Sequence, residues 1–148
     1  MSLFDKINQD IKQAILNKDR ERLEALRAIK SAFLLAQTEK GEKTLSEEKE
    51  LSIIQKLAKQ RLDSAAIYKE NNRADLYEVE MAQAKVIQSY LPESLSDEAL
   101  KTYLTELIAK VGATSMKDMG KIMGTATKEL AGKADGSRIS AMVKKLLG

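Results

Sequence analysis

The chain has 148 residues, of which 43% are hydrophobic and 32% charged, with a net charge of +3 and no His, Cys or Trp. This length suits one compact domain or two small ones. The missing residue types exclude disulfides, His- or Cys-bound metals and a His-activated nucleophile. No apolar run is long enough to cross a membrane, and the N-terminus lacks the apolar stretch of a secretory signal. We therefore expect a cytoplasmic protein without membrane association.

Apolar residues recur every three or four positions through the first 92 residues, which predicts amphipathic helices. Ser2 is positioned to cap a first helix, and Asp19 a second that stops at Gly41. Ser46 opens a third helix that runs to about Glu70. A return helix after Asn71-Asn72 makes the third and fourth helices a long hairpin.

Three acidic residues, Glu47, Glu48 and Glu50, follow Ser46 at the start of the third helix. Carboxylates in a first helical turn interact favourably with the positive end of the helix dipole. We interpret the cluster as ordinary stabilisation of that helix, and we expect no metal site.

The single proline, Pro92, removes a backbone donor and disfavours helix at the residue before it. It marks the joint between residues 1–92, with about four helices, and residues 93–148. Capping residues in the second segment predict three short helices, with boundaries near Ser96, Gly112, Ser115, Gly132 and Asp135. The sequence therefore predicts an all-α, multihelical fold: an N-terminal helical subdomain with a long hairpin, and a C-terminal three-helix subdomain.

Charge is distributed unevenly along the chain. Residues 1–92 hold 16 Lys and Arg against 15 Asp and Glu, whereas residues 110–148 hold eight against three. A basic surface of this kind attracts anionic partners, although lysine is also the commonest residue for solvating a helix. The candidate nucleic-acid-binding residues are Lys117, Lys121, Lys128, Lys133, Gly136, Arg138, Lys144 and Lys145.

Four of the seven glycines lie in two Gly-Lys-x-x-Gly runs at residues 120–124 and 132–136. A phosphate-binding loop is excluded, because it needs an earlier glycine and a Ser or Thr directly after the lysine. Gly120 and Gly124 share a helix face, which predicts close approach of another helix or backbone. Gly132 is expected to adopt a left-handed turn, and Gly136 lies in the first turn of the last helix. Turn architecture alone explains this pattern; alternatively, Gly136 leaves the amides of that helix uncovered for an anion.

Catalytic chemistry has little support in the residues. A nucleophile needs an activating base beside it, and no Lys or carboxylate is distinguished by its spacing from a Ser, Thr or Tyr. We expect no intrinsic enzymatic activity, no cofactor and no metal. The methionines of the tail are interpreted as adaptable core residues.

A family resemblance accompanies these motifs. The runs Val-Gly-Ala at 111–113, Asp-Met-Gly-Lys-Ile-Met-Gly at 118–124 and Gly-Lys-Ala-Asp-Gly at 132–136 resemble the GatB/YqeY motif. Segments 61–65 and 90–93 resemble the same family, so the likeness covers essentially the whole chain and points to the free-standing YqeY-like proteins. The related sequence forms the C-terminal region of the B subunit of the tRNA-dependent amidotransferase, a helical appendage that contacts tRNA.

The resemblance implies a two-part helical fold and a role in tRNA binding or translation, but it does not bring the amidotransferase's catalytic parts. Three functions remain open. The chain is a non-catalytic binding protein for tRNA or a tRNA-processing complex, an accessory component of glutamine-dependent tRNA amidotransfer, or a helical adaptor that binds protein. An amidotransferase-associated activity would be carbon–nitrogen ligation with glutamine as amide donor.

Overall fold

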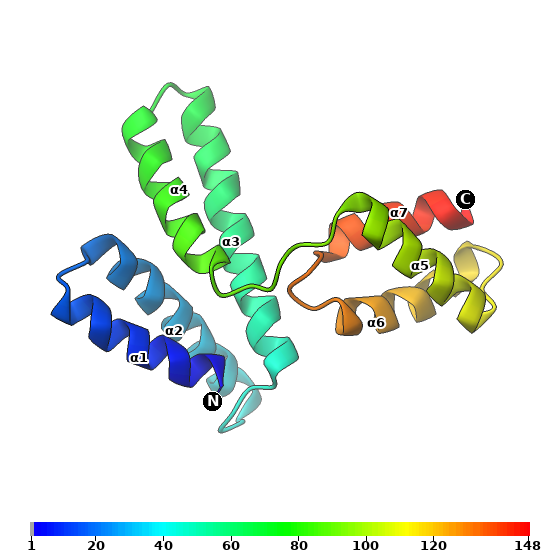
Figure 1. Cartoon of the computed structure of the whole chain (residues 1–148), viewed down its shortest axis with the longest axis horizontal. Coiled ribbons are helices and arrows are strands. Elements are labelled where there is room, and N and C mark those ends of the chain that lie inside the picture. The colour runs from blue at the N-terminus through cyan, green and yellow to red at the C-terminus, as the bar shows by residue number, and fades with distance from the viewer. Residues whose placement is uncertain (1) are drawn as a thin grey trace. The chain divides into compact units, whose positions relative to one another are not determined.

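The computed structural model describes residues 2–148, and its regular elements are all helical (Figure 1). No strand forms among these residues, so the predicted all-α fold is confirmed. The chain divides into two compact units, Met1–Leu91 and Pro92–Gly148. Unit 1 contains α1 (Leu3–Leu16), α2 (Arg20–Lys40), α3 (Glu47–Glu70) and α4 (Ala74–Gln88), and unit 2 contains α5 (Asp97–Val111), a 3₁₀ turn η1 (Met116–Asp118), α6 (Met119–Glu129) and α7 (Gly136–Leu147).

The helix ends of unit 1 follow local capping chemistry. Ser2 and Asp5 form a reciprocal capping box at α1, Asp19 accepts a bond at the start of α2, and Ser46 does the same for α3. Gly41 ends α2 in the left-handed conformation, with φ of +67°. These predicted boundaries are confirmed because each depends on residues within one helical turn.

The core of unit 1 is built from one face of each helix. In Figure 1, α1 and α2 run side by side, and α3 and α4 form the long hairpin. Ile29 and Phe33 of α2 are fully buried with Ile54 of α3 and Ile87 of α4. The ring of Phe4 in α1 stacks on that of Phe33, with centroids 5.8 Å apart. Burial of these side chains is the main favourable contribution to folding of the unit.

Glu50 departs from its predicted role. Glu47 and Glu48 are exposed, but Glu50 is only 3% exposed and its carboxylate accepts a 2.9 Å hydrogen bond from the Phe4 amide. It therefore caps α1 from a neighbouring helix, beyond its place in the first turn of α3. Burial raises the pKa of Glu50, and the backbone hydrogen bonds from Phe4 and Leu3 oppose that rise. Glu50 does lie in the first turn of α3, as the sequence predicted, but that interpretation missed its bond to α1.

Tyr90 ties the end of α4 to the other side of unit 1. Its hydroxyl donates a 2.5 Å hydrogen bond to Asp10 of α1 and accepts a 3.2 Å bond from Arg22 of α2. Arg22 also lies 3.8 Å from the Asp10 carboxylate, and the ammonium of Lys6 lies over the tyrosine ring. Burial and the hydrogen bond to Asp10 raise the pKa of Tyr90. This network fixes three helices beside the last residue of unit 1.

Unit 2 has its own core, formed by α5, α6 and α7. Leu100 and Leu104 of α5 pack in one buried cluster with Ile122 of α6 and with Ile139 and Val143 of α7. Ser96 caps α5 with its side chain, and Gly112 ends that helix with φ of +76°. The two units therefore have separate hydrophobic clusters.

Candidate nucleic-acid interface

One exposed face of α6 combines bare backbone with positive charge. Lys121 and Lys128 are seven residues apart, so they project from the same side of the helix, and Gly124 lies between them. All three are exposed, whereas Ile122 and Ala126 on the opposite side are fully buried. The unit 2 core thus fixes which side of α6 faces solvent.

The two carboxylates at the ends of α6, Asp118 and Glu129, are bonded to other elements. Glu129 accepts a 2.6 Å hydrogen bond from the hydroxyl of Tyr103 on α5. Asp118 accepts a 3.1 Å bond from the amide of Thr114. Burial, together with the bond to Glu129, raises the pKa of Tyr103, so the phenol remains a neutral donor at physiological pH. The face between Lys121 and Lys128 therefore carries positive charge without an acidic neighbour on the same side of α6.

Gly120 and Gly124 do not support close packing inside the chain. A Cβ atom built on either residue meets nothing within 4 Å, and both residues are exposed. The predicted close approach of another helix is therefore absent among residues 2–148. These glycines instead leave part of the α6 backbone uncovered by side chains, next to the lysines.

The N-terminus of α7 is occupied by the chain's own carboxylate. Asp135 is the N-cap, and it accepts bonds from the amide of Arg138 at 2.8 Å and the hydroxyl of Ser137 at 2.7 Å. Gly136 is the first residue of α7, but the capping carboxylate lies where an external anion was predicted. The uncovered-amide interpretation of Gly136 is therefore not supported. Gly132 has the predicted left-handed φ, at +78°.

Arg138 is engaged in holding unit 2 together. Its guanidinium donates to the carbonyl of Leu95 at 2.7 Å, to Asp97 at 2.9 Å and to the hydroxyl of Ser94 at 3.3 Å. The carbonyl of Lys133 in turn accepts a 3.0 Å bond from the amide of Leu95. These bonds connect the segment before α5 to the loop before α7. Arg138 therefore has a structural role that its positive charge alone did not reveal.

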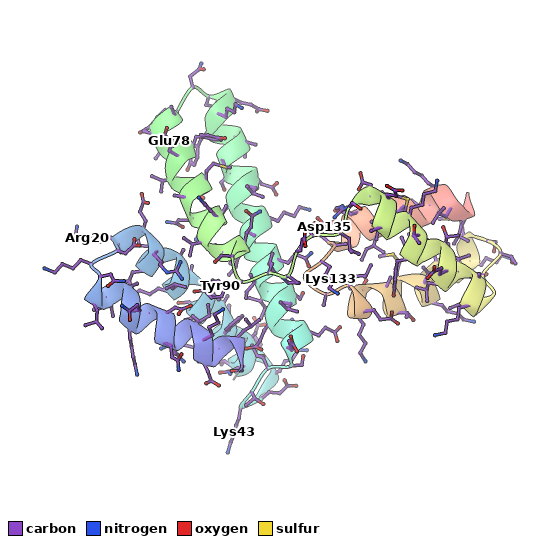
Figure 2. The ribbon with its side chains drawn as sticks, in the orientation of Figure 1. Arg20, Lys43, Glu78, Tyr90, Lys133 and Asp135 are labelled. Atoms are coloured by element: carbon purple, nitrogen blue, oxygen red, sulfur yellow. The ribbon has the colours of Figure 1, made fainter. Side chains whose placement is uncertain are left out.

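The remaining predicted lysines are exposed, but they lie on different elements of unit 2. Lys117 lies in η1, directly before α6. Lys133 lies with Asp135 in the segment joining α6 to α7, where Figure 2 labels both. Lys144 and Lys145 lie in the last turn of α7, where positive charge also complements the helix dipole. Of the eight predicted residues, the α6 face brings together Lys121 and Lys128.

Within residues 2–148, no three acidic, His or Cys side chains gather in a way that could hold a metal ion. The same residues contain no helix both long and apolar enough to cross a bilayer. Sequence reasoning missed the contacts of Glu50, Tyr90 and Arg138, and also the bond between Tyr103 and Glu129. For Glu50 there was a signal, because it lies four residues before Ile54 and therefore on the buried face of α3.

Comparison with known proteins identifies similar chains. A family model described as "Yqey-like protein" matches residues 4–147. A Clavispora lusitaniae protein named "Altered inheritance of mitochondria protein 41, mitochondrial" is 32% identical over 152 residues, covering 98% of this chain and 87% of that protein. Proteins of the same name from Vanderwaltozyma polyspora and Pyrenophora tritici-repentis are 33% and 28% identical, covering 83% and 99% of this chain and 71% and 81% of their own lengths.

These matches confirm the resemblance to YqeY-like proteins and support it in preference to the amidotransferase tail. They also overturn the expectation of a cytoplasmic protein, because these relatives are named as mitochondrial. The expectation depended on a missing secretory signal. That test does not address mitochondrial targeting, which uses amphipathic, basic segments in place of an apolar run.

Proposed function

The chain belongs to the YqeY-like family, and from that premise we propose that it binds tRNA or another structured RNA of translation without catalysing a reaction. The observation that carries the proposal is the exposed face of α6, where Lys121 and Lys128 flank the bare backbone at Gly124. Lysines supply the charge that binds phosphates. The uncovered helix surface lets a sugar-phosphate backbone approach closely.

The aromatic residues favour recognition of folded shape over base stacking. Tyr103 is bonded to Glu129, and Tyr90 is 93% buried in unit 1, since its exposed fraction is 7%. Neither ring is therefore presented as a free stacking platform of the kind that binds single strands. Contacts with phosphates and 2′-hydroxyls of a folded RNA fit this surface better.

The test is a salt titration of tRNA binding. Fluorescence anisotropy would measure the affinity of labelled tRNA, including a mitochondrial tRNA because the relatives are named mitochondrial. For Lys121→Gln/Lys128→Gln we expect weaker binding, and a slope of log affinity against log salt that is less steep by about 1.5, as two phosphate contacts are lost. The matched control is Lys12→Gln/Lys59→Gln, which neutralises two exposed lysines of unit 1.

The outcomes separate the alternatives. Equal affinity and equal slope for the wild type and the α6 variant would overturn the proposal. Wild-type protein that fails to bind tRNA at low salt, but is retained by a protein partner after nuclease treatment, would favour the adaptor function. Association with a tRNA amidotransferase, without binding to tRNA itself, would favour the accessory function in amide transfer.

A further inference from the structure

A groove separates α2 from α3 on the surface of unit 1. Its volume is about 320 Å³, and its apolar lining consists of Ala32, Leu35 and Ala36 from α2 with Ile53 and Leu57 from α3. Ala36 is buried at its floor, whereas Leu35 is 60% exposed. The α2–α3 groove therefore has both an apolar recess and an apolar side chain that projects into solvent beside it.

The rim of the α2–α3 groove has opposite charges on its two walls. Glu39 lies on the α2 wall, and Lys49 and Lys56 lie on the α3 wall. Among residues 2–148, none of these three side chains forms an ion pair within 4 Å. The wall charges are thus available to a partner.

We propose that the α2–α3 groove is the interface through which two copies of this chain form a two-fold dimer. A two-fold axis places the same patch on both partners, so the patch must complement itself. Leu35 of each copy would fill the apolar recess of the other. The opposite charges of the walls suit the same arrangement, because Glu39 of one copy would face Lys56 of the other.

The groove is shorter than a standard interface, so a dimer centred on it would also cover the helix surface around it. The lining runs over residues 32–39 of α2 and 49–60 of α3, so the walls extend for roughly 12 Å and 18 Å at the usual helical rise. Standard interfaces bury about 800 Å² on each partner. A patch dominated by one charge would repel its own copy, whereas these walls carry both signs.

Sedimentation equilibrium of the full chain, from about 1 µM to about 1 mM, tests the proposal directly. We expect reversible dimerisation of the wild type. Leu35→Asp should weaken it at least about 100-fold, since each dimer loses two buried leucines. Ile67→Asp is the matched control, because Ile67 is 57% exposed on α3 and does not line the groove. A wild type that stays monomeric throughout, or equal effects of the two variants, would overturn the proposal.

Charge reversal and cross-linking test the pairing itself. Glu39→Lys and Lys56→Glu should each weaken the dimer several-fold, and the double variant should recover most of the loss. Because the chain has no cysteine, Leu35→Cys introduces a single thiol. A short bismaleimide should join two Leu35→Cys chains in good yield, but not two Ile67→Cys chains. A two-fold contact through this groove would be contradicted if the two charge reversals weakened the dimer additively in the double variant. Equal cross-linking of Leu35→Cys and Ile67→Cys would contradict it as well.

Discussion

The two units use their charged side chains differently. In unit 1 the carboxylates of Glu50 and Asp10 point inward, where they fix the start of α1 and the hydroxyl of Tyr90. In unit 2 most of the basic residues are exposed to solvent, whereas the side chain of Arg138 joins separate segments of the unit. An excess of positive charge in a segment therefore predicts binding only when the basic residues with structural contacts are excluded from the count.

The largest expected effect tests whether the units fold independently. Phe33→Ala removes a fully buried ring from unit 1 and should destabilise that unit by about 3–5 kcal/mol. Ile122→Ala should destabilise unit 2 by about 2–5 kcal/mol. Because the hydrophobic clusters are separate, we expect hydrogen exchange to accelerate only in the unit that carries the substitution. Equal acceleration in both units would show a single cooperative fold.

Local capping explains how much of the fold could be predicted. Asp19, Ser46 and Ser96 each bond an amide three residues away, so the amino-acid pattern alone identifies the start of each helix. Glu50 and Arg138 bond backbone groups 46 and 43 residues away. Spacing places Glu50 on the buried face of α3, but the partner of either side chain depends on how the helices pack, which spacing and composition do not reveal.

The candidate site shows the same division. The helical period placed Gly120 and Gly124 on one face, and the structure retains that placement. Whether the face meets another helix or solvent is decided by the packing of α5 and α7, which bury Ile122 on the opposite side. The sequence predicts close packing at these glycines, whereas the structure has open space there. The helical period shows which residues share a face, but it does not show what lies against that face.

A smaller effect concerns the buried carboxylate that distinguishes unit 1. The pKa of Glu50 in the folded state lies above its ordinary value of 4.5, so the folded protein holds this proton more tightly than the unfolded chain. The resulting stabilisation is complete below pH 4.5 and is lost as pH rises through the folded-state pKa. Glu50→Gln keeps the side chain neutral and should not show this loss.

Urea unfolding at about pH 4 to about pH 7 would measure the difference. The free energy of unfolding of Glu50→Gln, taken relative to the wild type, should increase with pH across the window above 4.5. Glu48→Gln is the matched control, because it removes an exposed carboxylate from the same turn of α3. Parallel pH profiles for Glu50→Gln and the wild type would mean that Glu50 titrates alike in the folded and unfolded states.

The smallest effect asks why unit 2 exposes glycines within a helix. Gly124→Ala should raise the free energy of unfolding by roughly 0.8–1.0 kcal/mol, since alanine favours the helix interior and its Cβ meets nothing within 4 Å. Gly120→Ala should raise it by less, because Gly120 lies in the first turn of α6. Gly41→Ala should instead destabilise the chain, because Gly41 has φ of +67°. Thermal unfolding would measure whether each variant is more or less stable than the wild type.

The same glycines allow a test of binding. If the backbone exposed at these glycines admits an RNA strand, the stabilised double variant Gly120→Ala/Gly124→Ala should bind tRNA more weakly than the wild type. Unchanged affinity would assign the binding to the lysines alone and leave the glycines as a cost in stability without a role in that contact.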